Sequence, residues 1–189
     1  GKLDSFTPIK VSHLLSADDY YFTDSHWRQD KIADIAEYMA NCMGTDIEYE
    51  YEKLTLERAF MGVYVGQSAL KCKPDTITYL TNEIINRFYV TGANAVYDIE
   101  KANGKDAYEL FLSGNQPLVK INNPQNTNGK KLIVFRDSFA SSIMPLLAQG
   151  YSEVTMIDLR YINSQLLDKF VDFSQADVLF MYSASLLNN

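Results

Sequence analysis

The sequence predicts an α/β fold: a parallel sheet flanked by helices, with a β-rich insert in the middle of the chain. Its C-terminal third alternates apolar runs of strand length, at 132–135, 153–159 and 178–182, with helical patterns. Such alternation is typical of parallel sheets, whose strands need crossover connections. The middle of the chain contains β-branched and aromatic runs that are separated by glycine and proline, and no linker bounds it. We therefore expect residues 1–189 to form one domain.

The individual elements follow from the same patterns. Apolar residues at helical spacing predict helices over Ile32–Met43, after Ser138 and over Ile162–Phe173. Pro145 should kink the second of these helices or shorten its first segment. Further short strands or apolar segments are expected at Tyr20–Phe22, Ile47–Tyr51, Phe60–Val65, Thr76–Leu80, Ile84–Val90, Ala95–Ile99, Tyr108–Leu112 and Leu118–Ile121.

Composition limits the classes of function. Hydrophobic residues make up 47% and charged residues 22% of the chain, as in ordinary globular domains. A net charge of -7 with no basic block disfavours nucleic-acid binding. Cys42 and Cys72 lack metal-ligand spacing, so no metal or other cofactor is expected; the two could pair, but separate buried thiols are favoured. No apolar run is long enough to span a membrane and no signal peptide is present, but a chain that begins at Gly1 says nothing about a natural targeting segment.

The stretch from Lys130 to Gln149 places Ser138 at a hinge between a predicted strand and a predicted helix. This position is the carboxyl edge of a sheet, where open α/β folds bind ligands. The N–H of Ser138 would belong to the helix's first turn, which suits a developing oxyanion. The alternative is that Ser138 or Asp137 only caps the helix, because both residue types are favoured at that position.

A serine nucleophile needs a base, and the chain has only two histidines. His13 has no acidic or aromatic motif around it, whereas His26 follows Asp24 by two residues and precedes Trp27. In a loop such a pair can place the carboxylate on a ring nitrogen. The Asp-x-His motif is weak by itself, since a lone histidine is more often an ordinary hydrogen-bonded residue.

Four blocks of the sequence resemble the DHHW family of bacterial surface proteins. They are YYFTDSHW at Tyr20–Trp27, the strand and helix around Arg136-Asp137-Ser138, VTMIDLRYI at Val154–Ile162 and FLSGNQPL at Phe111–Leu118. That family is similar in turn to the SGNH hydrolase-like proteins of alginate O-acetylation. The resemblance implies an SGNH-like domain, part of a longer protein at the bacterial cell surface.

By position, the resemblance implies Ser138 as nucleophile, His26 as general base and Asp24 as the orienting carboxylate. Two residues depart from the family pattern: Ser25 replaces the first histidine of Asp-His-His-Trp, and Arg136 stands where lysine is usual. Neither departure removes a member of the triad.

The donors for a tetrahedral oxyanion are less well specified. The chain continues as Tyr182-Ser183 after the last predicted strand, so the asparagine that SGNH-type sites place there is missing. Asn115 is an alternative donor, although it could equally be a turn residue. Arg160 could bind an anionic or hydroxyl-rich substrate, or form an ordinary ion pair.

The function expected from both lines of argument is a serine-dependent carbohydrate O-acetylesterase or O-acetyltransferase that acts on a cell-surface polysaccharide. Its partner would be a polysaccharide or acetylated carbohydrate and not a nucleic acid, and any membrane contact would need a segment outside these 189 residues. The alternative is a non-catalytic module of the bacterial cell surface, either one that binds glycans through its 13 tyrosines or a purely structural one.

Overall fold

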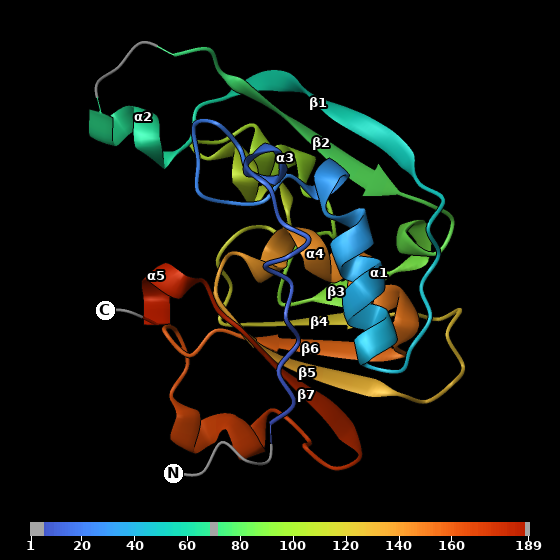
Figure 1. Cartoon of the computed structure of the whole chain (residues 1–189). Coiled ribbons are helices and arrows are strands. Elements are labelled where there is room, and N and C mark those ends of the chain that lie inside the picture. Colours follow the sequence, from blue (N-terminus) through green and yellow to red (C-terminus); the bar gives the residue numbers. More distant parts are fainter. Residues whose placement is uncertain (1–5, 69–71, 188–189) are drawn as a thin grey trace.

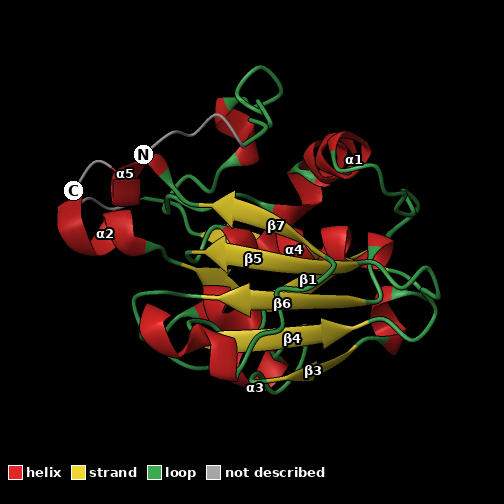
Figure 2. Cartoon of the chain, turned by 90° about the horizontal axis from the view of Figure 1, so that it is seen from below, coloured by secondary structure: helices red, strands yellow, loops and turns green. Residues whose placement is uncertain are grey.

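The chain forms a mixed α/β fold with two sheets and several helices (Figures 1 and 2). The computed structural model describes residues 6–68 and 72–187. Its strands are β1 Glu52–Phe60, β2 Asp75–Thr81, β3 Tyr89–Thr91, β4 Leu118–Asn122, β5 Lys131–Arg136, β6 Glu153–Ile157 and β7 Ala176–Met181. Its α-helices are α1 Ala33–Cys42, α2 Val63–Ser68, α3 Ile99–Ala102, α4 Ala140–Leu147 and α5 Ala184–Leu187. Short 3-10 helices span Ala17–Asp19, Gln29–Lys31, Ile85–Arg87, Ala107–Leu110, Ala148–Gly150 and Ser164–Lys169.

The larger sheet is mixed, which corrects the expectation of a parallel sheet. Its strand order is β3-β4-β6-β5-β7, and the strands β6, β5 and β7 pair in parallel. Strands β3 and β4 pair antiparallel, as do β4 and β6, so that β4 runs against its neighbours (Figure 2). The smaller sheet is the antiparallel pair β1–β2. Three of the five pairings are therefore antiparallel.

Strand β5 shows why this sequence forms a sheet that is covered on both faces. Leu132 and Val134 are buried in the main core, whereas Ile133 and Phe135 are buried in a smaller core on the opposite face. Because neighbouring strand residues point to opposite faces, an unbroken apolar run fits a central strand. Helices α1 and α4 cover the first face and contact each other (Figure 1).

A third core fills the space beneath the β1–β2 hairpin and includes Tyr21, Phe60, Ile77, Tyr108 and Phe111. It joins the hairpin to the chain segments around Tyr21 and Tyr108. Tyr21 packs edge-on against Phe60, with ring centroids 5.0 Å apart. The hairpin is thereby attached to the segment that carries Asp24 and His26.

Several predicted elements differ in the structure. The strand predicted at Ile47–Tyr51 is wrong, because β1 begins only at Glu52. The β character predicted for Phe60–Val65 ends at Phe60, where Gly62 leads into α2. Ala95–Ile99 forms only an isolated bridge at Tyr97, and Ile162–Phe173 forms a 3-10 helix over 164–169. Both cysteines are free, and Cys42 is exposed and not buried as favoured.

Candidate active site

The structure brings Ser138, His26 and Asp24 together in one hydrogen-bonded chain. His26 Nε2 lies 2.8 Å from Ser138 Oγ, and His26 Nδ1 lies 2.5 Å from Asp24 Oδ1. An ionised carboxylate can only accept a hydrogen bond, so the ring proton is on Nδ1 and Nε2 is free to accept from the serine hydroxyl. A serine, an imidazole and a carboxylate linked in this order have the geometry that a serine nucleophile requires.

Ser138 is held at the hinge after β5 by its neighbour Asp137. The Asp137 carboxylate accepts hydrogen bonds from the N–H of Phe139 at 3.0 Å and from the N–H of Ser183 at 2.8 Å. Asp137 therefore caps the turn before α4 and ties it to the chain after β7, while the hydroxyl of Ser138 faces His26. The N-cap of α4 itself is Phe139, which has no side-chain cap, so neither Asp137 nor Ser138 caps the helix in the expected way.

Asp24 and His26 lie in a tight loop that an antiparallel bridge between Tyr20 and Trp27 closes. Inside the loop the N–H of Tyr21 donates to the carbonyl of His26 at 3.2 Å. Just after the loop, the side chain of the buried Gln29 donates to the carbonyl of Ser142 in α4 at 2.6 Å. The loop is thus fixed relative to α4, the helix that follows Ser138.

The Asp24 carboxylate is satisfied almost entirely by the protein. Besides the His26 ring, it accepts the N–H of His26 and the N–H of Val63, both at 3.0 Å. Burial acts to raise the pKa of Asp24, but the hydrogen bonds from His26 and Val63 outweigh it and leave the pKa below its ordinary value. Asp24 therefore stays ionised over the range in which an imidazole can act as base.

The β1–β2 hairpin supplies further contacts that sequence inspection did not find. The Asp75 carboxylate accepts the Thr23 N–H at 2.7 Å and the Thr23 hydroxyl at 2.6 Å. A Cβ built on Gly62 would lie 2.2 Å from the Asp24 Cβ. Glycine is therefore required at position 62 for the hairpin end to approach the acid so closely. These contacts join residues about 40 to 50 positions apart, and no local pattern signals them.

Two aromatic rings enclose the imidazole of His26. Tyr108 stacks on it with ring centroids 4.0 Å apart, and Phe139 lies tilted against it at 4.9 Å. The Tyr108 side chain is buried, and burial raises the pKa of its hydroxyl well above the ordinary value. Tyr108 therefore acts here as a neutral packing surface that fixes the plane of the His26 ring. It was predicted only as part of an apolar segment.

Ser138 opens into a shallow pocket of about 200 Å³ that Ser25, His26, Ser183 and Arg160 also line. The Ser138 N–H has no hydrogen-bond acceptor among residues 6–68 and 72–187, so it is free to donate to a ligand. Arg160 is bound through Nε and Nη2 to the buried Asp158, at 2.9 and 2.6 Å. Arg160 thus forms the ion pair of the alternative interpretation and also borders the pocket, and its binding of a substrate stays a prediction.

Asn115 is not brought to the pocket. Its side chain is exposed and is absent from the pocket lining. It follows Leu112, Ser113 and Gly114, all of which have positive φ angles, so the segment is a turn of unusual shape. The interpretation of Asn115 as a turn residue is the one that this position supports.

The described residues 6–68 and 72–187 include no group of three or more His, Cys, Asp or Glu side chains arranged to hold a metal ion. Over the same residues, no helix combines the length and apolar character that crossing a bilayer requires.

Solved structures of two proteins are among those with a fold similar to that of this chain. A DHHW family protein from Eubacterium siraeum matches with a TM-score of 0.66 and 22% identity, over 87% of this chain and 59% of that one. Bacillus cereus PatB1 matches with a TM-score of 0.68 and 24% identity in a structure with a sulfonyl adduct, over 90% of this chain and 62% of that one. A second PatB1 structure matches with a TM-score of 0.66 and 23% identity, over 90% of this chain and 64% of that one. The chain thus spans about three fifths of the length of these proteins.

No curated protein matches the chain. The DHHW protein family matches residues 10–157, a span that includes Asp24, His26 and Ser138. Because the match extends over more than half of the sequence, the chain belongs to the DHHW family.

Proposed function

We propose that this chain transfers acyl groups, with Ser138 as nucleophile, His26 as general base and Asp24 as the residue that orients the base. The observation that carries the proposal is the hydrogen-bonded chain from Ser138 Oγ through the His26 ring to Asp24, with distances of 2.8 and 2.5 Å. A catalytic serine needs both links, because the base must take its proton and the resulting imidazolium must be stabilised.

The reaction would proceed in two halves. Ser138 Oγ attacks the carbonyl carbon of an ester while its proton moves to His26 Nε2, and the carbonyl oxygen becomes an oxyanion that faces the Ser138 N–H. Collapse of this intermediate expels the alcohol, which takes the proton from His26 and leaves an acyl-serine. A second hydroxyl compound then gives its proton to His26, attacks the acyl-serine and restores the free enzyme.

The proposed substrate is an O-acetylated carbohydrate. Transfer to water would make the protein an esterase, and transfer to a sugar hydroxyl would make it an O-acetyltransferase. We further propose an SGNH-like arrangement at the bacterial cell surface, with a polysaccharide as partner and membrane contact only through other segments of a longer protein. Membership of the DHHW family and the PatB1 fold similarity support this proposal.

The test is active-site acylation. The parent chain, incubated with p-nitrophenyl acetate, should release a burst of about one equivalent of p-nitrophenol and gain the mass of one acetyl group, while Ser138→Ala should do neither. PatB1 has been solved with a sulfonyl adduct, so a sulfonyl fluoride is a second probe, expected to label the parent and to leave Ser138→Ala unlabelled. Equal labelling of both chains would exclude Ser138 as the nucleophile.

One observation favours the non-catalytic alternative, a glycan-binding or structural module. The asparagine that could complete an oxyanion site, Asn115, is exposed and lies outside the pocket lining, which leaves the Ser138 N–H as the only donor assigned here. Losing one oxyanion donor costs about 2.7–4 kcal/mol in the barrier, so an incomplete site would be slow. A chain that binds glycans and resists both acylating probes would support this alternative.

A further inference from the structure

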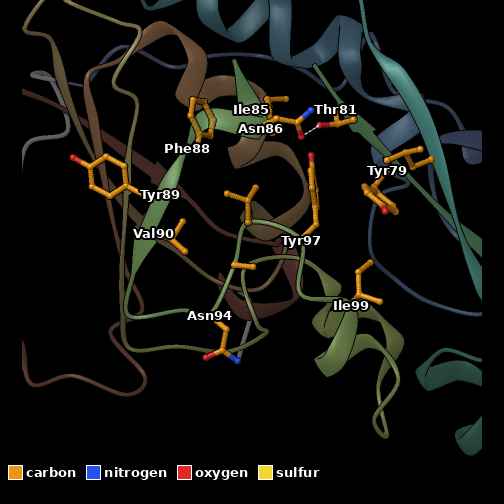
Figure 3. Close-up of a pocket in the computed structure, with 13 residues that line it drawn as sticks. Tyr79, Thr81, Ile85, Asn86, Phe88, Tyr89, Val90, Asn94, Tyr97 and Ile99 are labelled. Carbon is orange, nitrogen blue, oxygen red and sulfur yellow. Dashed lines mark hydrogen bonds between the residues drawn. The ribbon is translucent and has the colours of Figure 1, made fainter. Parts of the chain in front are cut away.

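A second cavity, of about 510 Å³, lies between the β1–β2 hairpin and the edge strand β3 (Figure 3). We call it the inter-sheet pocket, and it is lined by residues of both strands of the hairpin, of the segment 85–90 and of the loop 94–97. In Figure 3, Phe88 and Tyr89 lie on one side, Tyr79 and Ile99 on the other, and Tyr97 between them. None of its lining residues lines the pocket of Ser138.

Among the described residues, the side chains that line the inter-sheet pocket are all uncharged. The lack of charge distinguishes this lining from the rest of the chain, which contains 17 Lys and Arg residues and 24 Asp and Glu residues. A charged ligand would leave its water shell here without gaining a counter-ion, and that loss is costly. The volume falls within the range of about 300–1,000 Å³ that small-molecule sites occupy. The pocket therefore favours a neutral ligand.

Two asparagines border the pocket, and each has an amide atom without a hydrogen-bond partner among the described residues. Asn86 accepts the Thr81 hydroxyl through Oδ1 at 2.6 Å, and among the described residues its Nδ2 has no acceptor. Asn94 donates from Nδ2 to Asp98 at 2.9 Å, and among the same residues its Oδ1 has no donor. An amide donor and an amide acceptor can together bind the hydroxyl groups of a sugar.

Aromatic rings supply the remaining feature of a sugar site. Tyr79 and Tyr97 lie with ring centroids 4.8 Å apart and form one wall, and Tyr89, 59% exposed, lies at the rim. A tyrosine side chain has an apolar ring face and a polar hydroxyl at its end. It therefore suits a sugar, whose C–H face is apolar and whose edge carries hydroxyls. Amide groups, tyrosines and the lack of charge thus point to the same ligand class.

The pocket is also held in shape by contacts behind its lining. The Tyr97 hydroxyl donates to the carbonyl of Leu80 at 2.5 Å and lies 3.1 Å from Gln29 Nε2. The N–H of Asn94 donates to the Ser113 hydroxyl at 2.9 Å, which in turn donates to Asp98 at 2.6 Å. A site that is already ordered loses less conformational entropy when a ligand binds.

From these observations we propose that the inter-sheet pocket binds a neutral carbohydrate, at a site distinct from Ser138. Binding there requires no acyl transfer, so the proposal stands apart from the proposed function. If both hold, the pocket would retain a neutral glycan chain on the protein while another part of the glycan reaches the nucleophile.

The test is a titration of the Ser138→Ala chain, which removes the proposed chemistry and keeps the inter-sheet pocket intact. Neutral oligosaccharides (chitotetraose, cellotetraose and mannotetraose) and the charged tetragalacturonate would be added while amide shifts are followed by NMR. We expect saturable binding of at least one neutral oligosaccharide and weaker binding of the charged one. Tyr89→Ala and Asn86→Ala should each raise its Kd about tenfold, equivalent to about 1.4 kcal/mol.

Tyr49→Ala is the matched control, because Tyr49 is 58% exposed and does not line the inter-sheet pocket. Its Kd should equal that of the parent, and unchanged thermal midpoints would show that all three variants fold. The proposal is overturned if no neutral oligosaccharide binds saturably, if tetragalacturonate binds as tightly, or if Tyr89→Ala and Asn86→Ala behave like Tyr49→Ala.

Discussion

Asp24 combines near-complete burial with three hydrogen bonds to one carboxylate. Its side chain is 4% exposed, and its partners are the His26 ring, the His26 N–H and the Val63 N–H. These partners hold the pKa of Asp24 below its ordinary value in spite of burial. The same contacts that orient the base therefore also contribute to the stability of the folded chain, and they do so only while the carboxylate is charged.

A pH dependence of stability follows from the lowered pKa of Asp24. A carboxyl group whose folded pKa is depressed stabilises the fold above its unfolded pKa of about 3.9, and this stabilisation is lost as the pH falls through the folded value. We expect the difference in the free energy of unfolding between the parent and Asp24→Asn to be constant above about pH 5 and to shrink below about pH 4. Urea denaturation across this range measures it, and a difference that does not change with pH would contradict it.

The β1–β2 hairpin acts on the site through its end at Gly62 and Val63. The Val63 N–H donates to Asp24 at 3.0 Å, and the Gly62 N–H donates to the hydroxyl of Thr23 at 3.0 Å. The connection between β1 and β2 therefore holds Thr23 and the Asp24 carboxylate in place. Sequence patterns identified β2 correctly but extended the strand character of Phe60 through these two residues, so their role could not be foreseen.

Two glycines of this connection allow a matched test. A Cβ on Gly62 would overlap Asp24, whereas a Cβ on Gly66 would have no heavy atom within 4 Å. If the acylation of Ser138 depends on the placement of Asp24, Gly62→Ala should lower the acylation rate by about 10²-fold, the loss expected for a displacement of about 1 Å. Gly66→Ala should leave the rate unchanged.

Burst kinetics with p-nitrophenyl acetate measure both variants. Asp75→Asn is a further comparison, because it removes the charge of the side chain that accepts from Thr23 but keeps its shape. Its acylation rate shows the effect of that charge without the steric overlap that Gly62→Ala introduces. A Gly62→Ala chain that acylates at the parent rate, with an unchanged thermal midpoint, would show that the hairpin does not position the acid.

The larger sheet has an exposed apolar edge at β7. This strand is last in the order β3-β4-β6-β5-β7, and its side chains Val178 and Phe180 are 45% and 50% exposed. Phe170 and Phe173, which precede it, are also exposed. Unpaired strand edges with apolar side chains are sites of association between chains.

We expect this 189-residue chain to self-associate as its concentration rises, through the β7 edge. Val178→Lys places a charge on that edge and should reduce the association measured by sedimentation velocity. The variant should still acylate at the parent rate, since Val178 does not line the pocket of Ser138. A parent chain whose sedimentation does not change with concentration would contradict the prediction.

The sequence foretold some parts of this molecule better than others, for physical reasons. The β5–α4–β6–β7 unit was predicted because buried parallel strands have continuous apolar runs that alternate with helical spacing. The direction of β4 was not predicted, because its alternating pattern at Leu118–Asn122 is the same whichever way the strand runs. The hydrogen bond from the Val63 N–H to Asp24 was not predicted either, because it joins residues far apart in the sequence and depends on the whole fold.

The sequence pointed to the three residues of the candidate site but not to the residues that surround them. The hinge at Ser138 and the Asp-x-His pair are local patterns, and the family resemblance joined them across the chain. For Asn115 the sequence left two alternatives, an oxyanion donor and a turn residue, because exposure cannot be inferred from a turn motif. The stacking of Tyr108 on His26 was missed because a buried tyrosine in an apolar segment has no local sign of its partner.

The separation of 112 residues between His26 and Ser138 has a consequence for biosynthesis. A ribosome delivers the acid and the base early, the serine much later, and Ser183, whose N–H holds the hinge at Asp137, almost last of these 189 residues. A growing chain would thus carry Asp24 and His26 for 112 residues before Ser138 is added. If Ser138 is the proposed nucleophile, it would become reactive only after β7 and Ser183 had docked against the hinge at Asp137.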